Sequence, residues 1–153
     1  MASTLNMIET LTTHLMDALP ECDVLHFAGI ATAYVPASAS GTILLTYHGS
    51  LFATTADTEY LAQPRLTRFV ISMLSPQSLG SHAALALLDR VRRAVLGLRL
   101  PDCRQVRAVQ EEYLGESQAH WLYRLELVAD SLWVEDRDAD GGPPVMDVKY
   151  VAD

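Results

Sequence analysis

The sequence predicts an α+β fold, a two-layer sandwich in which two helices pack on one face of a mostly antiparallel sheet of about four strands. Two stretches of the chain repeat apolar residues with a helical period, and most of the remaining stretches alternate apolar and polar residues. Half of the residues are hydrophobic and one fifth are charged, which is typical of globular proteins. At 153 residues we expect one domain, residues 1–134, followed by a polar linker and C-terminal arm, residues 135–153.

The first predicted helix covers residues 5–19. Ser3 or Thr4 can cap its start, because a hydroxyl oxygen there accepts a hydrogen bond from an unpaired amide of the first turn. Pro20 ends it, since proline cannot continue the backbone hydrogen bonding. The side chains expected on its inner face are Leu5, Ile8, Leu11, Leu15 and Leu19.

Three candidate strands lie in the first half of the chain, at residues 24–27, 42–48 and 65–74. The first is either a short strand or part of a loop, so the sheet has four or five strands. The third alternates cleanly, so one of its faces is expected to carry Phe69, Ile71 and Met73, and the other Arg68, Val70 and Ser72. Residues 50–64 show no sustained period and predict either a long loop or the arm of an extended hairpin. Long loops in small domains are often the segments that contact partners.

A second helix is predicted after Ser78 or Ser81, which would cap it, and Gly97 and Pro101 mark its end. Its expected inner face consists of Ala84, Leu87, Leu88, Val91, Ala94, Val95 and Leu98.

Two large apolar residues of this second helix fall outside its inner face. Leu85 and Leu96 are eleven residues apart, about three helical turns, so both are expected on one side of the helix, beside Arg92 and Arg93. They are either tolerated surface leucines or part of a subunit contact.

The last predicted elements form a hairpin with Gly115 at its turn. Alternation over residues 121–128 places Trp121, Tyr123, Leu125 and Leu127 on the core, with the intervening residues facing water or a neighbouring subunit. The linker after Val134 is polar and rich in glycine and proline. Strand-like residues, VMDVKYVAD, then follow, and such a segment is often an arm that adds to a sheet edge, its own or a neighbour's.

Composition and charge exclude several classes of function. The net charge of −8 disfavours a stable DNA complex, because a nucleic-acid-binding protein needs cations to displace counterions from phosphates. The sequence has no apolar run approaching the ~20 residues of a membrane-spanning helix, so no membrane partner is expected. The N-terminus lacks the basic start and apolar stretch of a secretory signal, which indicates a cytosolic origin.

No catalytic constellation emerges from the sequence. Gly115–Ala119 approaches the Gly-x-Ser-x-Gly motif of serine hydrolases around Ser117, but a strand is predicted after the serine where that motif needs a helix. The histidines are scattered, and Cys22 and Cys103 have no second cysteine at zinc-ligand spacing. We therefore expect reduced thiols, no metal and no cofactor.

Five stretches carry a resemblance to a known family: MIETLTTHLMDALP, TILLTYHG, RLTRFVISMLSPQS, AVLGLRLPDC and HWLYRLELV. The fourth contains a Gly-Leu-x-x-Pro step at Gly97–Pro101. In this order the stretches resemble the tail terminator proteins of tailed bacteriophages, in particular those of Mu-like and other contractile-tailed phages and prophages. The resemblance covers most of residues 5–134.

The resemblance implies a non-enzymatic virion protein that is assembled in the host cytoplasm and located at the tail–neck region. Such proteins form a ring, usually hexameric, at the head-proximal end of the tail, where they end tube polymerisation. Their partners are the tube, sheath and neck proteins, and DNA passes through the lumen without specific binding. Alternatives are another neck protein, for head or tail completion, or a small serine hydrolase. The residues expected at subunit or partner contacts are Leu51, Phe52, Tyr60, Leu85, Arg92, Arg93, Leu96, Val148 and Tyr150.

Overall fold

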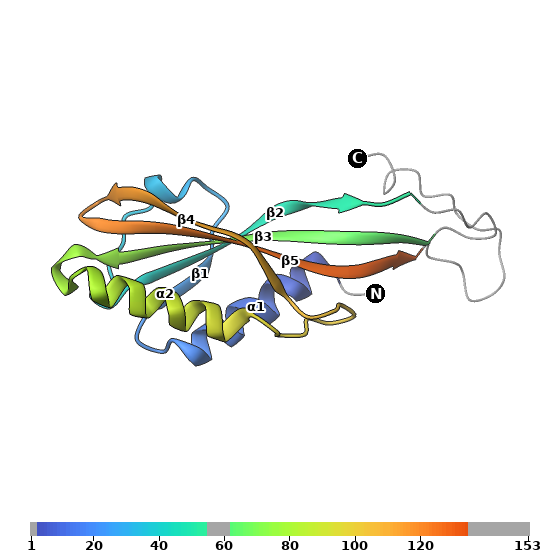
Figure 1. The fold of residues 1–153 in the computed structure, drawn as a ribbon, viewed down its shortest axis with the longest axis horizontal. Coiled ribbons are helices and arrows are strands. Elements are labelled where there is room, and N and C mark those ends of the chain that lie inside the picture. The colour runs from blue at the N-terminus through green and yellow to red at the C-terminus, as the bar shows by residue number, and fades with distance from the viewer. Residues whose placement is uncertain (1–2, 55–61, 135–153) are drawn as a thin grey trace.

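The computed structural model describes residues 3–54 and 62–134, which form one five-stranded sheet with two α-helices (Figure 1). In chain order the elements are α1 Thr4–Ala18, β1 Asp23–His26, the 3-10 turn η1 Ala31–Ala33, β2 Thr42–Phe52, β3 Ala62–Pro76, the 3-10 turn η2 Gln77–Leu79, α2 Ser81–Val95, β4 Arg107–Ser117 and β5 His120–Val134. The strand order is β1-β2-β3-β5-β4, with β1 parallel to β2 and the other neighbours antiparallel. The predicted α+β fold is confirmed, and the short strand β1 brings the sheet to five strands.

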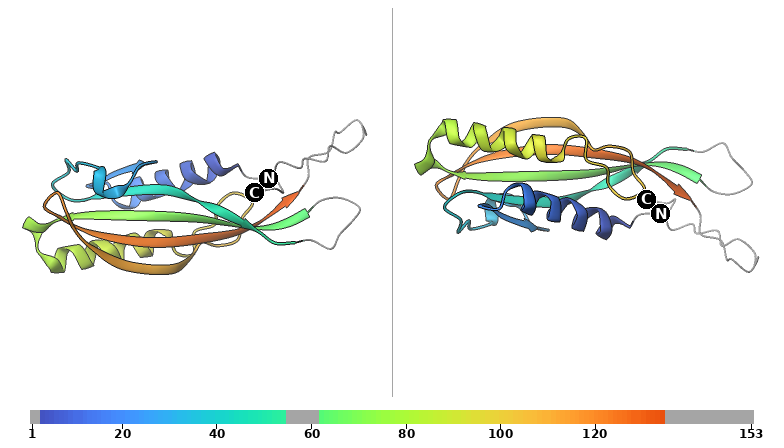
Figure 2. Two further views of the ribbon diagram at one scale, coloured as in Figure 1. Left: turned by 90° about the horizontal axis from the view of Figure 1, so that it is seen from above. Right: turned by 90° about the horizontal axis from the view of Figure 1, so that it is seen from below.

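Both helices lie side by side on one face of the sheet (Figure 2), where α1 packs on β1 and β2 and α2 packs on β3. The main core fills the space between these layers. Its strand residues are Val24, Ile43, Leu45, Phe69, Ile71, Met73, Leu125, Leu127 and Ala129, and its helix residues include Met7, Ile8, Leu11, Leu15, Leu87, Leu88, Val91 and Val95. The inner face predicted for β3 is therefore confirmed. That of β5 is confirmed for Leu125 and Leu127, with Tyr123 packed against the core, but not for Trp121.

The first helix begins as predicted but turns a different face to the core at its start. The hydroxyl of Ser3 accepts a hydrogen bond from the amide of Asn6 at 3.0 Å. Leu5, expected in the core, is 62 % exposed, and Met7 is buried instead. The reason is local: Leu5 lies beside the end of β1, where the described residues place no further strand next to β2.

The second helix is shorter than the sequence indicated. Its N-terminal cap is Gly80, and no side chain caps the first turn, so the expectation of a serine cap is wrong. The helix ends at Val95, and Leu96 has an extended backbone with ψ 130°. Leu96 is therefore not a helical residue, and the three-turn spacing that placed it on one side with Leu85 does not apply.

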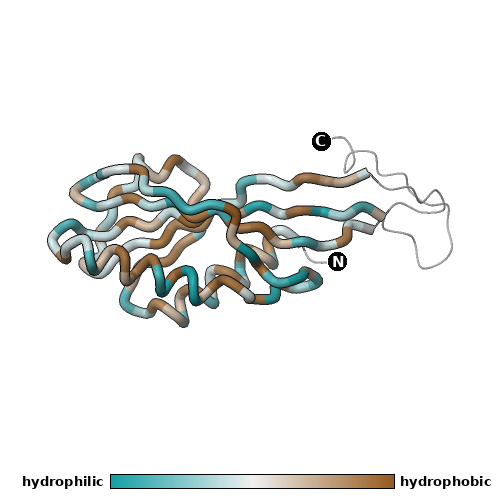
Figure 3. The backbone as a smooth tube through the Cα atoms, viewed as in Figure 1, coloured by the Kyte–Doolittle hydropathy of each residue, from teal (hydrophilic) through white to brown (hydrophobic). Residues whose placement is uncertain are grey.

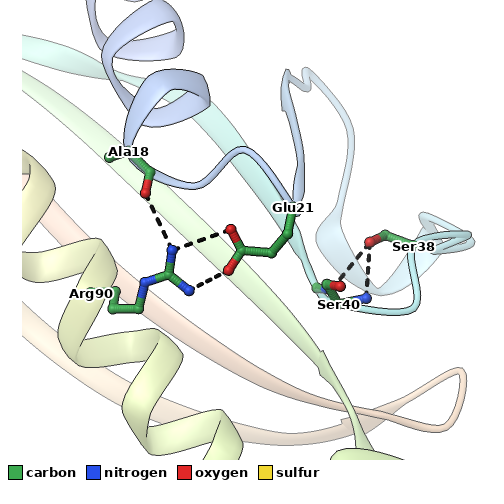
Figure 4. Close-up of polar contacts among 6 residues, drawn as sticks. Ala18, Glu21, Ser38, Ser40 and Arg90 are labelled. Atoms are coloured by element: carbon green, nitrogen blue, oxygen red, sulfur yellow. Dashed lines mark hydrogen bonds and ion pairs between the residues drawn. The ribbon is translucent and has the colours of Figure 1, made fainter.

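An arginine of α2 joins the two helices (Figure 4). The guanidinium of Arg90 makes two hydrogen bonds to the carboxylate of Glu21 and a third to the carbonyl oxygen of Ala18 at 3.3 Å. The pKa of Glu21 is lowered, chiefly by the hydrogen bond from Arg90. Because both side chains are exposed, this pair adds little stability but fixes the end of α1 against α2.

The opposite face of the sheet has a small second core that the sequence did not reveal. Leu44, Leu74 and Leu122 are buried there beneath residues of the segment 25–34, in which the rings of Phe27 and Tyr34 meet edge to face at 5.4 Å. Leu122 was expected to face water or a neighbour, which is wrong at this end of the sheet. Trp121, expected in the core, is only half-buried.

The turn between β4 and β5 lies at Gln118 and Ala119, not at Gly115 as predicted. Both turn residues have left-handed backbones, with φ 53° and 61°. A two-residue turn of this kind usually carries asparagine, aspartate or glycine, so the sequence signal was weak. Gly115 lies instead at a β-bulge, where its φ of 100° suits glycine.

Three strands, β2, β3 and β5, continue past the helices at one end of the molecule and form an arm (Figure 1). In this arm β2 reaches Phe52 and β3 begins at Ala62. Of the two predictions for residues 50–64, the extended hairpin is thus the correct one over the described residues; residues 55–61 lie outside them.

Two leucines of α1 that were both assigned to the core should respond differently to truncation. Leu11→Ala should lower the free energy of unfolding by about 2–5 kcal/mol, because this fully buried side chain leaves a cavity. Leu5→Ala should lower it by clearly less, because the described residues leave this side chain 62 % exposed. Urea unfolding followed by circular dichroism measures both, and equal losses would contradict the packing of α1.

Candidate subunit interface

The base of the arm is held by a buried arginine. Arg65 is 5 % exposed and donates hydrogen bonds to the hydroxyls of Thr4 at 2.7 Å and Ser50 at 3.1 Å. Its guanidinium also lies over the rings of Phe52 and Trp133, at 5.9 and 5.6 Å from their centroids. These contacts tie all three strands of the arm to the start of α1. Phe52, expected at a partner contact, is half-buried in this cluster.

The other face of the arm presents apolar side chains to solvent. Leu51 is 56 % exposed and Leu132 is 53 % exposed, with half-buried Leu66 on the strand between them. We call these three residues the arm surface; apolar segments occur on each strand of the arm in Figure 3. Leu51 was predicted as a contact residue. Leu132 was not predicted as a contact residue, because the alternation of the residues around it is that of an ordinary strand.

Two further exposed leucines lie toward opposite ends of α2. Leu85 is 48 % exposed and Leu96 is 41 % exposed. Arg92 donates hydrogen bonds to Asp89 and, at 2.7 Å, to Glu111 on β4. The hydrogen bond that Arg92 donates to Glu111 is the main cause of the raised pKa of Arg92. Arg92 is thus paired within the subunit, while Arg93 is exposed. We call Leu85, Arg93 and Leu96 the α2 surface.

Strand β4 is a sheet edge whose apolar residues were not recognised in the sequence. Val109, Tyr113 and Leu114 are each about half exposed, at 55, 53 and 46 %. Two register shifts interrupt the strand, so its side chains do not keep one simple alternation. Because of this irregularity, the sequence of β4 lacks the regular alternation that would predict an exposed apolar edge.

No catalytic arrangement forms at the residues that suggested one. Ser117 lies on a hairpin strand and donates a hydrogen bond to the carbonyl oxygen of Thr32 at 3.4 Å. A two-residue turn and β5 follow it, so the strand–serine–helix geometry of a hydrolase is not present there.

Within residues 3–54 and 62–134, no group of three or more histidine, cysteine, aspartate or glutamate side chains is placed to hold a metal ion. In the same part of the chain, neither helix has the length and hydropathy needed to cross a membrane.

Both cysteines are free, as predicted. Burial raises the pKa of the Cys22 thiol to about 11, with a smaller contribution from the charge of Glu21. Burial likewise raises the pKa of Cys103. A reactive cysteine needs a lowered pKa, so neither thiol has the environment of a nucleophile.

Three of the residues predicted at contacts, Tyr60, Val148 and Tyr150, lie outside the described residues. Of the contact residues that the structure describes, Leu51 and Leu85 are exposed, on the arm and on α2. Phe52 and Arg92 instead contact other residues of the same subunit.

Comparison with known proteins gives one family. The family model described as "Gp37 protein" matches residues 11–151. No curated protein matches the chain. A chain in the structure "Virion of native gene transfer agent (GTA) particle" is similar at 17 % identity and a TM-score of 0.46, over 88 % of this chain and 96 % of that one. At this level the structural similarity assigns no function.

The thiols offer a test of the packing around Cys22. Near pH 8 the native chain should react with a disulfide reagent at least about tenfold more slowly than the unfolded chain, because so little of the Cys22 thiol is ionised. This raised pKa contributes stability below the unfolded pKa of about 8.5, and that stability is lost as the pH rises toward 11. Rapid labelling of Cys22 in the native chain would contradict its placement.

Proposed function

The chain belongs to the Gp37 protein family, and we propose that it is a structural, non-enzymatic subunit of a phage-like virion, specifically a tail terminator. In this role copies of the chain form a ring, most simply a hexamer, at the head-proximal end of the tail. The ring ends tube polymerisation and joins the tube and sheath to the neck. It is assembled in the host cytoplasm and remains at the tail–neck region of the virion.

The observation that carries this proposal is the projecting arm with its exposed arm surface. A three-stranded arm fixed to α1 by Arg65 is stiff enough to hold Leu51 and Leu132 away from the subunit's own core. Exposed leucines on a rigid projection are poorly explained by folding of the single chain. They suit docking against another protein.

Ring closure needs two different surfaces on each subunit, because a head-to-tail contact joins unlike patches. The arm surface lies at the projecting end, and the α2 surface lies on the helix layer. We assign the subunit contact to these two surfaces. The order of elements, which resembles that of tail terminators, supports the same assignment.

The acidity of the chain fits a ring around DNA. With a net charge of −8, a channel formed by several copies repels phosphates, so DNA can pass without being held. Another neck protein, for head or tail completion, would share this composition. Its position would differ, at the portal and not where tube and sheath end.

The α2 surface can be tested by changing its charge. Leu85→Asp with Leu96→Asp should leave the subunit folded but prevent assembly, because two carboxylates would then have to be desolvated in the contact. Light scattering after gel filtration should show a fall toward the 16.8 kDa of a single chain. The matched control, Met16→Asp, changes a side chain on α1 that is 52 % exposed and should leave assembly intact.

The proposed role itself is tested on particles. Purified virions should contain the chain, and electron microscopy with a labelled antibody should locate it as a ring where the tail meets the neck. Location at the portal would favour the other neck role. Absence of the chain from purified particles would contradict both.

A further inference from the structure

A groove runs between α1 and the edge of the sheet where β1 ends. It has a volume of about 380 Å³ and is lined by Thr4, Leu5, Ile8, His26, Ala28, Thr46 and Tyr47. A second hollow of about 310 Å³ continues it along α1. Two large side chains are left uncovered there, Leu5 at 62 % exposed and Tyr47 at 37 %.

The groove lies beside a strand position that none of the described residues fills. β1 pairs with β2 only through residues 42–45 of β2. The last contacts on this side are two hydrogen bonds: the amide of Phe27 donates to the carbonyl oxygen of Leu45, and the hydroxyl of Thr46 donates to the carbonyl oxygen of Phe27. From Tyr47 to Phe52, β2 continues along the arm and pairs only with β3 among the described residues. Its outward backbone groups can therefore accept another strand.

One segment of the same chain has the length and pattern for this position. Residues 145–151 read VMDVKYV, in which Met146, Val148 and Tyr150 alternate with Asp147 and Lys149. The free edge from residue 46 to 52 has the same length. The Gp37 family match extends to residue 151, so this segment belongs to the family's common region.

Direction and reach also fit. β2 and β5 run the same way, because both are antiparallel to β3, so a segment that turns back after β5 runs antiparallel to β2. The vacant position is three strand spacings from β5, or ~14 Å. The ten residues 135–144 can span up to ~33 Å.

The nearer edge, that of β5 itself, is already occupied. Cys103 bridges to Ser131, and the amide of Arg104 donates to the oxygen of Asp130 at 2.8 Å. A returning segment that paired with β5 would have to displace these contacts. The outer side of β2 requires no displacement among the described residues.

We propose that residues 145–151 of the same chain add to the sheet as a sixth, antiparallel strand along Tyr47–Phe52, with Met146, Val148 and Tyr150 over the groove. This strand covers Leu5 and leaves Asp147 and Lys149 on the side facing away from α1. The added strand becomes the sheet edge beside the arm portion of β2, and β4 stays the edge on the other side of the sheet. The inference does not depend on the proposed ring.

Hydrogen exchange of the full-length chain tests the proposal. In the parent chain the amides of residues 47–52 should exchange at least about tenfold more slowly than in the double variant Val148→Asp, Tyr150→Asp. In that variant two carboxylates replace apolar side chains, so residues 145–151 cannot pack in the groove. Leu5→Asp should expose the same amides from the other side of the contact. The matched control, Asp147→Asn with Lys149→Gln, should keep them protected.

Amides of β3 and α2 serve as the internal reference, since they should exchange equally in all variants. Equal exchange of residues 47–52 in parent and Val148→Asp, Tyr150→Asp chains would overturn the proposal. Protection that disappears on dilution would also overturn it, because the strand would then come from a second copy. Failure of ring formation with protection intact would instead affect only the proposed function.

Discussion

The structure depends on the pairing of β3 along its full length. All fifteen residues of β3 align with β5, and most also align with β2, so its backbone is hydrogen-bonded on both sides. Because a central strand needs no helix to satisfy its amides, the sheet can continue beyond the helix layer. The arm is the direct result. A shorter β3 would give an ordinary sandwich with no projection to offer a partner.

The same pairing decides where the sheet is covered and where it is not. Helices occupy one face of the central region, and the segment 25–34 covers part of the other. Neither reaches the end of the arm, so apolar side chains such as Leu51 and Leu132 stay in contact with water. At the base of the arm, Arg65 links the strands to α1 through hydrogen bonds and contacts with aromatic rings. The subunit thus has a firm core and apolar surface at its periphery, a distribution suited to assembly.

Residues with reactive groups serve packing and pairing in this fold. Arg90 joins α1 to α2, Arg92 joins α2 to β4, and Arg68 pairs with Glu126 across neighbouring strands at 3.0 Å. Both thiols have raised pKa values caused mainly by burial. The three arginines connect neighbouring elements, which agrees with a structural role for the chain.

The period of apolar residues alone determined the fold class, the order of the elements, the inner face of β3 and the inner positions Leu125 and Leu127 of β5. Tertiary structure decided the rest, because it depends on neighbours that are distant in the chain. Leu5 and Leu11 share one helical pattern, yet only Leu11 is buried by the residues that the structure describes. Leu122 is buried by a segment nearly a hundred residues earlier, and the turn at Gln118 is imposed by the register of β4 on β5. Which leucines face a partner is likewise decided by where the layers end.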